Sequence, residues 1–290
     1  MQRVGGERAR ERRGELLPKR ISFVCQSGRL EAQSVLLAAS LRLHFPVDVT
    51  LVAAHPVRHG LLNPVTAAAF EDLQVKIVPI ENPLDETYLI GHKIAALRLL
   101  DGPDLGLFLD SDILAMRKPE PLSNELAAVP ASGQICSPAT WRHIYASFGM
   151  QVPARAPATL NTQETTAPYY NSGMIAIPGE MAVRFSTDWT ACARKIDLDP
   201  QVPDLAKRPY LDQTSFPVAA AACGQPINRL GPEWNFPSWI WRVPDGSCPI
   251  FFHYQRTRHL ARQSLTLKAA QAAKSILPTV QQALLSETDI

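Results

Sequence analysis

The chain has 290 residues, of which 46% are hydrophobic and 19% charged, and its formal net charge is +2. This length and composition suit one large α/β domain, and the small net charge argues against a dedicated nucleic-acid-binding protein. No stretch reaches the roughly 18 apolar residues that a membrane helix needs. The first residues also lack the apolar core of a secretion signal, so we expect a cytoplasmic protein.

Residues 1–19 mix arginines with glutamates and contain little apolar surface. We therefore expect a disordered basic tail, followed by a single domain over residues 20–290. The alternative for the tail is a weak peripheral contact of its arginines with anionic lipid at the inner membrane. The five cysteines are scattered and form no CxxC pair, which predicts free, buried thiols in a reducing compartment.

Strand and helix alternate through the first half of the chain. Apolar β-rich runs predict strands at residues 20–25, 47–54, 75–80 and 105–109. Stretches of helical spacing predict helices at residues 31–45, 63–74 and 86–100, the second with Asn63 as its N-cap and Pro64 at its first position. This alternation predicts a Rossmann-like, mostly parallel sheet flanked by helices on both faces.

The second half is less regular. A proline-rich stretch over residues 150–168 predicts a long loop of the kind that can form a lid. The later expectations, in chain order, are a strand at 169–177, helices at 179–196 and from about 211, a Trp-rich turn at 232–241, a strand at 249–254 and a C-terminal helix at about 263–290. The domain then divides into a nucleotide-binding half (about 20–120) and an acceptor and sugar half (about 121–262).

The fourth predicted strand ends in two carboxylates, in the run "LGLFLDSDILAMRKP". Asp110 and Asp112 are separated by the small Ser111, and parallel sheets bind ligands at the carboxyl ends of their strands. Such a pair can hold a divalent cation that also grips a diphosphate. The alternative is a solvated strand end that is merely acidic.

Five segments resemble those of a known enzyme family and occur in its order. "FLDSDILAMRKP" resembles the DxD segment of A-type glycosyltransferases, and "YYNSGMIAI" resembles the Asn-Ser-Gly strand of the glycogenin-like retaining glycosyltransferases (family 8). "LDQTSF", "PEWNF" and "FFHY" resemble that family's Asp-Gln motif, its aromatic-flanked Asn and its metal-binding His strand. The resemblance runs from about Arg20 to His259. It implies a nucleotide-diphospho-sugar transferase fold and a metal-dependent enzyme that moves a sugar from a nucleotide sugar, UDP-sugar by default, with retention.

The resemblance also implies roles for the metal site. Asp110, Asp112 and His253 would bind Mn²⁺ or Mg²⁺, and Asp110 and Ser111 would contact the nucleotide. A lone His on an apolar strand could instead be a hydrogen-bonded core residue. The acceptor would be a glycan, a lipid-linked glycan or a protein.

The sugar-binding roles follow in the same way. Asn171 would hydrogen-bond a donor-sugar hydroxyl, and Gly173 would leave room for the sugar or diphosphate. Asp212 and Gln213 would stabilise the transition state near the anomeric carbon. Two plainer interpretations stay open: Asn-Ser-Gly can be a simple turn, and Asp212 can be a helix N-cap.

Lys93 lies on the apolar stripe of its predicted helix, four residues from both Leu89 and Leu97. Similar enzymes carry a basic residue here that reaches the nucleotide or the donor sugar. The alternative is a lysine whose stem follows the core edge to water. Arg98 points to another side of the helix, and we expect it to be solvated.

One segment departs from the family pattern. After the metal-binding His, the family has HxxGxxK, whereas this chain has "HYQRTRHL", with Arg256 at the Gly position and His259 at the Lys position. Arg256 or Arg258 could supply the diphosphate contact through a bidentate fork.

Two rival functions stay open. A catalytically degenerate sugar-nucleotide-binding protein would fit the altered segment. A phosphatase of haloacid dehalogenase type also uses a DxD motif, but after its first strand and with Thr or Val where this chain has Leu114.

Overall fold

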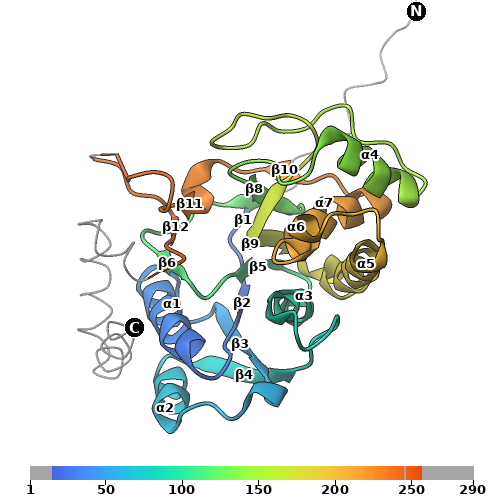
Figure 1. The fold of residues 1–290 in the computed structure, drawn as a ribbon. Coiled ribbons are helices and arrows are strands. Elements are labelled where there is room, and N and C mark those ends of the chain that lie inside the picture. Colours follow the sequence, from blue (N-terminus) through green and yellow to red (C-terminus); the bar gives the residue numbers. More distant parts are fainter. Residues whose placement is uncertain (1–14, 245, 257–290) are drawn as a thin grey trace, which may run out of the picture.

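The computed structural model describes residues 15–244 and 246–256. A seven-stranded sheet forms its centre, with helices packed on both faces (Figure 1). The strands β2, β3, β4 and β5 are parallel to one another, while β9 runs antiparallel to its neighbours β5 and β8. The strand order is β10 (Asn228–Arg229), β8 (Ala127–Pro130), β9 (Tyr170–Pro178), β5 (Leu105–Leu109), β2 (Arg20–Val24), β3 (Thr50–Pro56) and β4 (Val75–Ile80). The predicted mostly parallel α/β fold is confirmed.

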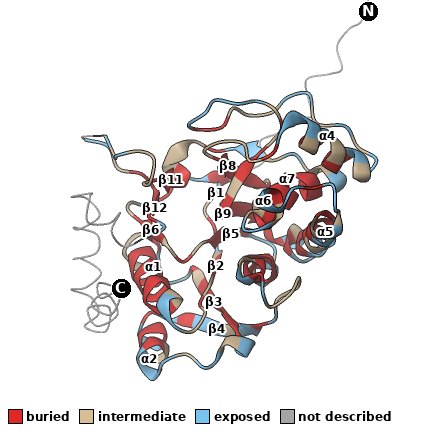
Figure 2. Ribbon diagram, in the orientation of Figure 1, coloured by how far each residue is buried: buried red, intermediate tan, exposed pale blue. Residues whose placement is uncertain are grey.

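The helices divide between the two faces of the sheet. Strand β5 shows the division, because Leu105, Leu107 and Leu109 point into one core and Phe108 into the other. The inner strands of the sheet are buried almost throughout, whereas the edge strands β4 and β10 are largely exposed (Figure 2). One face carries α1 (Arg29–His44) and α2 (Pro64–Asp72); the other carries α3 (His92–Leu97), α4 (Pro138–Ser147), α5 (Gly179–Leu198) and α7 (Leu211–Ala222), with the short α6 (Asp204–Lys207) beside α7.

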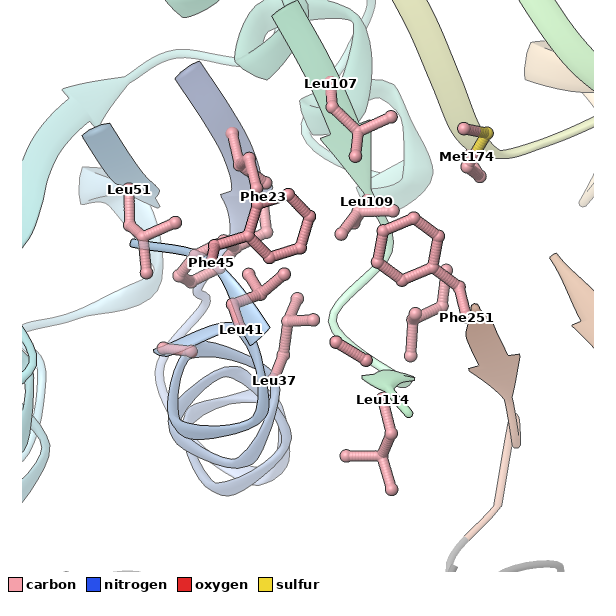
Figure 3. Packing of buried hydrophobic residues seen from close by; sticks show 14 of the residues in the cluster. Phe23, Leu37, Leu41, Phe45, Leu51, Leu107, Leu109, Leu114, Met174 and Phe251 are labelled. Atoms are coloured by element: carbon pink, nitrogen blue, oxygen red, sulfur yellow. The ribbon is translucent and has the colours of Figure 1, made fainter. Parts of the chain in front are cut away.

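The first core is shown in Figure 3. Leu37 and Leu41 of α1 lie under the sheet beside Phe23 of β2, and all three side chains are fully buried. Each such side chain contributes roughly 1.5–3 kcal/mol by leaving water. This packing fixes the strand ends at which the polar residues gather.

A small second sheet carries the end of the described chain. Strand β12 (Phe251–His253) pairs with β6 (Ile113–Ala115) on one side and with β11 (Phe236–Pro237) on the other. The antiparallel register places His253 opposite Ile113, one residue after Asp112. The predicted delivery of His253 to the DxD turn is therefore present in the fold.

Ordered structure starts before Arg20, the residue at which the sequence places the beginning of the domain. Strand β1 (Glu15–Leu16) pairs with β7 (Leu122–Ser123), and Lys19 donates its backbone N–H to the Leu105 carbonyl. The predicted tail is thus too long, because its last residues join the fold. The predicted C-terminal helix, Arg258 and His259 lie outside the described residues.

The helix expected over residues 86–100 is shorter and broken. It consists of the 3₁₀ turn η2 (Leu89–Gly91), α3 and the 3₁₀ turn η3 (Arg98–Leu100). Residues before Leu89 are held in a turn, because the Asp85 carboxylate accepts hydrogen bonds from the backbone N–H groups of Thr87 and Tyr88 at 2.8 and 3.1 Å. The start of α2 is as predicted, with the Asn63 side chain accepting from Val65 N at 2.9 Å.

The helix α4 and the strand β8 have no counterpart among the sequence predictions. Ser137 caps α4 by accepting from Thr140 N at 3.1 Å, and Pro138 opens it. All five cysteines are free thiols; three are buried and two half-buried. Among the described residues, no helix combines the length and apolar character needed to cross a membrane.

Candidate active site

The DxD turn lies at the carboxyl end of β5, between β9 and β12. The Asp110 N–H donates to the Gly173 carbonyl at 2.7 Å, and the Asp112 carbonyl accepts from Tyr254 N at 3.0 Å. Both backbone contacts hold the turn from opposite sides. The two carboxylates are thereby fixed against strands that come from the second half of the chain.

Asp110, Asp112 and His253 form one cluster. Each offers a ligand atom, and these atoms all lie within 4.8 Å of one another. The His253 Nε2 is 3.1 Å from Asp112 Oδ1. Two carboxylates and one imidazole are a donor set that fits Mn²⁺. The structure therefore brings together all three residues that the sequence predicts as metal ligands.

The protonation of this cluster follows from its charges. Burial disfavours the charged form of both members of the His253–Asp112 pair, but their mutual attraction prevails, so the pKa of His253 is raised and the pKa of Asp112 is lowered. Burial raises the pKa of Asp110, although Lys93 opposes this. A bound cation would compete with the proton on His253.

The second ring nitrogen of His253 has a partner as well. Its Nδ1 donates to Asn235 Oδ1 at 2.9 Å, and Asn235 Nδ2 donates to Asn171 Oδ1 at 3.0 Å. Trp239 packs edge-on against the His253 ring, with 5.0 Å between ring centroids. These contacts fix the ring so that Nε2 faces Asp112, the arrangement typical of a metal-binding His with an outer hydrogen-bond partner.

Lys93 is buried, and it joins two parts of the site. Its Nζ lies 3.1 Å from Asp110 Oδ2, 3.0 Å from Asp212 Oδ2 and 3.3 Å from Ser172 Oγ. Burial works to lower the pKa of Lys93, but the two carboxylates raise it above its usual value. The alternative of a lysine that reaches water is therefore wrong, whereas Arg98 is exposed as predicted.

Asp212 lies in the first turn of α7 but is not its cap. The N-cap is Tyr210, and no side-chain capping bond is present. Asp212 Oδ1 instead accepts from the Tyr88 hydroxyl at 2.8 Å, while Oδ2 accepts from Ser172 Oγ and lies beside Lys93. The N-cap interpretation of Asp212 is therefore wrong. Gln213 follows it and is half-buried.

The Asn-Ser-Gly segment forms the floor of the cluster. Asn171 Oδ1 accepts from Gly173 N at 2.8 Å. A Cβ on Gly173 would lie 2.7 Å from Asp110 Oδ2 and 2.9 Å from His253 Cε1. Gly173 is therefore needed for the close approach of Asp110 and His253 to the backbone. These two side chains fill the space that the sequence predicts for the sugar or diphosphate.

A cleft of about 410 Å³ opens beside the DxD turn. It runs between the start of α1 and the η2–α3 segment, at the carboxyl ends of the parallel strands, where such sheets bind nucleotides. Its lining residues are Val24, Gln26, Ser27, Arg29, Leu30, Gln33, Leu89, Ile90, Lys93, Asp110, Ser111 and Asp112. Asn171, Asp212 and His253 lie outside this lining, so the cleft borders only one side of the candidate site.

Several residues of the site were not singled out from the sequence. Tyr88, Ser172 and Asn235 have no role in the sequence predictions, although the last two stand in the quoted "NSG" and "PEWNF" segments. Their partners lie 18 to 124 residues away in the sequence, so only the fold reveals them. Arg256 is exposed at the end of the described chain.

The fold is that of glycosyltransferases. The galactosyltransferase LgtC, solved with donor and acceptor sugar analogues, has a TM-score of 0.53 at 14% identity, covering 88% of this chain and 95% of that one. The glycosyltransferase GlyE of Streptococcus pneumoniae TIGR4 has 0.52 at 13%, covering 93% and 62%. The bifunctional glycosyltransferase WbbM has 0.52 at 12%, covering 94% and 52%. At these identities the likeness establishes the A-type fold.

The family follows from the sequence match. The family described as the Rhodobacterales glycosyltransferase domain matches residues 21–224. The match covers more than half of the chain, so the chain belongs to this family and is a glycosyltransferase. No curated protein matches it.

Proposed function

We propose that this glycosyltransferase uses a divalent cation, with Mn²⁺ preferred, to transfer a sugar from a nucleoside-diphosphate sugar to an acceptor with retention of anomeric configuration. The observation that carries the proposal is the convergence of Asp110, Asp112 and His253 within 4.8 Å at the end of a nucleotide-sized cleft. The bound cation would neutralise charge on the diphosphate leaving group. UDP is the default nucleotide of the proposal.

The nucleotide would occupy the cleft. Polar side chains at the start of α1, among them Gln26, Arg29 and Gln33, line its wall and offer donors to base, ribose or phosphate. Ser111 lines the cleft and is small, which lets the ligand approach the turn. Arg256 and Arg258 remain candidates for a further diphosphate contact, through the guanidinium fork.

The role of Asp212 follows from its partners. Both carboxylate oxygens are engaged by Tyr88, Ser172 and Lys93, and the side chain is almost fully buried. A carboxylate held in this way is better suited to stabilising positive charge on the reacting sugar than to attacking it. We therefore propose an electrostatic role for Asp212, with Gln213 beside it.

Asn171 and Gln213 would orient the sugar. Asn171 Oδ1 already accepts two hydrogen bonds, which leaves its amide nitrogen to donate to a sugar oxygen. A glutamine also belongs to the active site of LgtC, since one of its structures carries a glutamine-to-glutamate active-site substitution.

The acceptor of the proposal is a glycan, a lipid-linked glycan or a protein. The cytoplasmic location and the lipid contact of the N-terminal arginines stay predictions from the sequence.

A thermal-shift screen of nucleotide sugars, with Mn²⁺ or with EDTA, tests the proposal. We expect one donor class to raise the melting temperature only with Mn²⁺ and to be hydrolysed slowly without acceptor. Asp104→Asn is the matched control for Asp112→Asn, because Asp104 is an exposed acid at the opposite end of β5. Donor binding without any turnover would favour the degenerate alternative, and no metal-dependent binding of any donor would refute the metal site.

A further inference from the structure

A second group of metal-ligand side chains lies apart from the DxD turn. His59 ends the 3₁₀ turn η1 (Val57–His59) after β3, Glu86 lies in the segment after β4, and His92 opens α3. Their ligand atoms all lie within 4.8 Å of one another. His59 Nε2 is 3.6 Å from Glu86 Oε2, and the two imidazole rings meet edge to face with 5.2 Å between centroids.

Three ring nitrogens of this group are buried without a hydrogen bond of normal geometry. His92 is 1% exposed, and neither of its ring nitrogens has a partner of normal hydrogen-bond geometry. The Nε2 of His59 is likewise buried without a hydrogen bond, and its contact with Glu86 is longer than one. A buried polar atom without a partner costs about 1–3 kcal/mol. One metal ion can take one nitrogen from each ring, so it would complete His59 Nε2 and one of the two His92 nitrogens.

Burial and charge at this group suit a metal ion. His92 is buried beside His59 and Glu86, and the neutral imidazole is the form that binds metal ions. Glu86 supplies the negative charge, and its only other ion-pair partner in the described chain is Arg58 at 3.7 Å, which is largely exposed.

We propose that His59, Glu86 and His92 bind a second divalent transition-metal ion, of which Zn²⁺ fits best. Two imidazoles and one carboxylate are a common zinc donor set that leaves a fourth position for water. Ligand atoms about 2.0 Å from a tetrahedral ion lie roughly 3.3 Å apart, so small rotations of these side chains complete the geometry. The DxD cluster, with two carboxylates and one imidazole, is the harder of the two sites.

The second ion would link two segments that border the nucleotide cleft. Leu89 and Ile90, which line the cleft, lie three and two residues before His92. On the other side, the residues after His59 contact the cleft through Ser27, whose Oγ donates to the Leu61 carbonyl at 2.9 Å. The ion therefore acts as a clamp on the cleft rim, and its proposed binding does not depend on the proposed transfer reaction.

Metal stoichiometry of the full-length, tag-free chain tests this site. The protein is stripped with chelator, dialysed against Zn²⁺ and measured by mass spectrometry. In an Asp112→Asn background, which weakens the first site, we expect one zinc ion per chain. Adding His59→Ala should remove it or weaken binding at least about tenfold. His143→Ala is the matched control, because His143 pairs with Asp199 outside both clusters.

Two outcomes would overturn the proposal: no zinc bound to Asp112→Asn, or zinc retained after His59→Ala. A second readout is independent of the first. Co²⁺ bound to the Asp112→Asn chain should give the strong visible absorption of tetrahedral nitrogen and oxygen ligation, lost in both His59→Ala and Glu86→Gln. His59 is half-buried, so its replacement should leave the fold intact by circular dichroism. Because neither readout measures turnover, failure here leaves the proposed transfer reaction untouched.

Discussion

Two clusters of histidine and carboxylate lie at the same edge of the central sheet, and they differ in how the protein completes them. In the DxD cluster, Lys93 sits between Asp110 and Asp212, and Asn235 holds the second nitrogen of His253. In the other cluster, neither ring nitrogen of His92 has a partner of normal hydrogen-bond geometry.

The two clusters therefore differ in what they need from a ligand. The DxD site is organised by protein groups alone, which suits the proposed cation that enters and leaves with the donor. The His59–Glu86–His92 site is incomplete without a ligand, which suits an ion that stays bound.

The largest effect should come from removing the positive charge of Lys93, whose Nζ lies between Asp110 and Asp212. Lys93→Met leaves two carboxylates facing each other in a buried place, and breaking such a pair costs about 3–5 kcal/mol. We expect this loss in the free energy of unfolding, measured with urea at pH 7, together with a loss of turnover. Arg98→Met, on the exposed side of the same segment, should change stability by less than about 0.5 kcal/mol. Equal stability of the two variants would contradict the role of Lys93.

An intermediate effect should come from removing the hydrogen-bond partner of His253 Nδ1, which leaves that nitrogen unpartnered like those of His92. Asn235→Ala removes the acceptor of the His253 Nδ1 proton and the link to Asn171. Loss of such an outer partner weakens metal binding about 10- to 100-fold. Turnover should therefore need more Mn²⁺ and be restored by it, as measured by Mn²⁺ titration of activity. Asn161→Ala, in an exposed turn, is the control, and an unchanged Mn²⁺ requirement in Asn235→Ala would show that Asn235 does not orient the ligand.

The smallest effect should come from an exposed ion pair near the second cluster. Hydrogen bonding to Thr87, aided by Arg208, lowers the pKa of Asp85 to about 2. A lowered pKa in the folded state means that the stabilisation is present above about pH 4 and is lost as the pH falls toward 2. Because both side chains are partly exposed, we expect less than about 1 kcal/mol.

Urea unfolding of wild type and Asp85→Asn, at pH 5 and at about pH 2, measures the contribution of this ion pair to stability. The difference between the two proteins should be present at pH 5 and shrink at about pH 2. A difference that grows on acidification would contradict the lowered pKa.

The sequence predicts the first half of the fold well because its signals are local. Strands β2, β3, β4 and β5 are apolar runs between amphipathic or capped helices, and Asn63–Pro64 marks the start of α2. The same signature, Ser137–Pro138, precedes α4 and could have revealed that helix. The antiparallel insertion of β9 between β5 and β8 has no local signal, since it depends on pairing between distant segments.

The candidate site divides in a similar way. Asp110 and Asp112 are evident from the strand that they end, and Lys93 from the apolar residues around it. Tyr88 was missed because its partner Asp212 is 124 residues away. His92 was missed because nothing in the sequence shows that its ring is buried beside His59.

The measurement that tests the central claim most directly is Mn²⁺ binding followed by electron paramagnetic resonance, in which the free-ion signal falls on binding. It is made in a His59→Ala background so that the second cluster does not contribute. The account predicts one Mn²⁺ ion per chain, weakened at least about tenfold by Asp112→Asn and unaffected by Asp104→Asn. Equal Mn²⁺ binding by all three proteins, or none by the His59→Ala protein itself, would contradict a metal site at Asp110, Asp112 and His253.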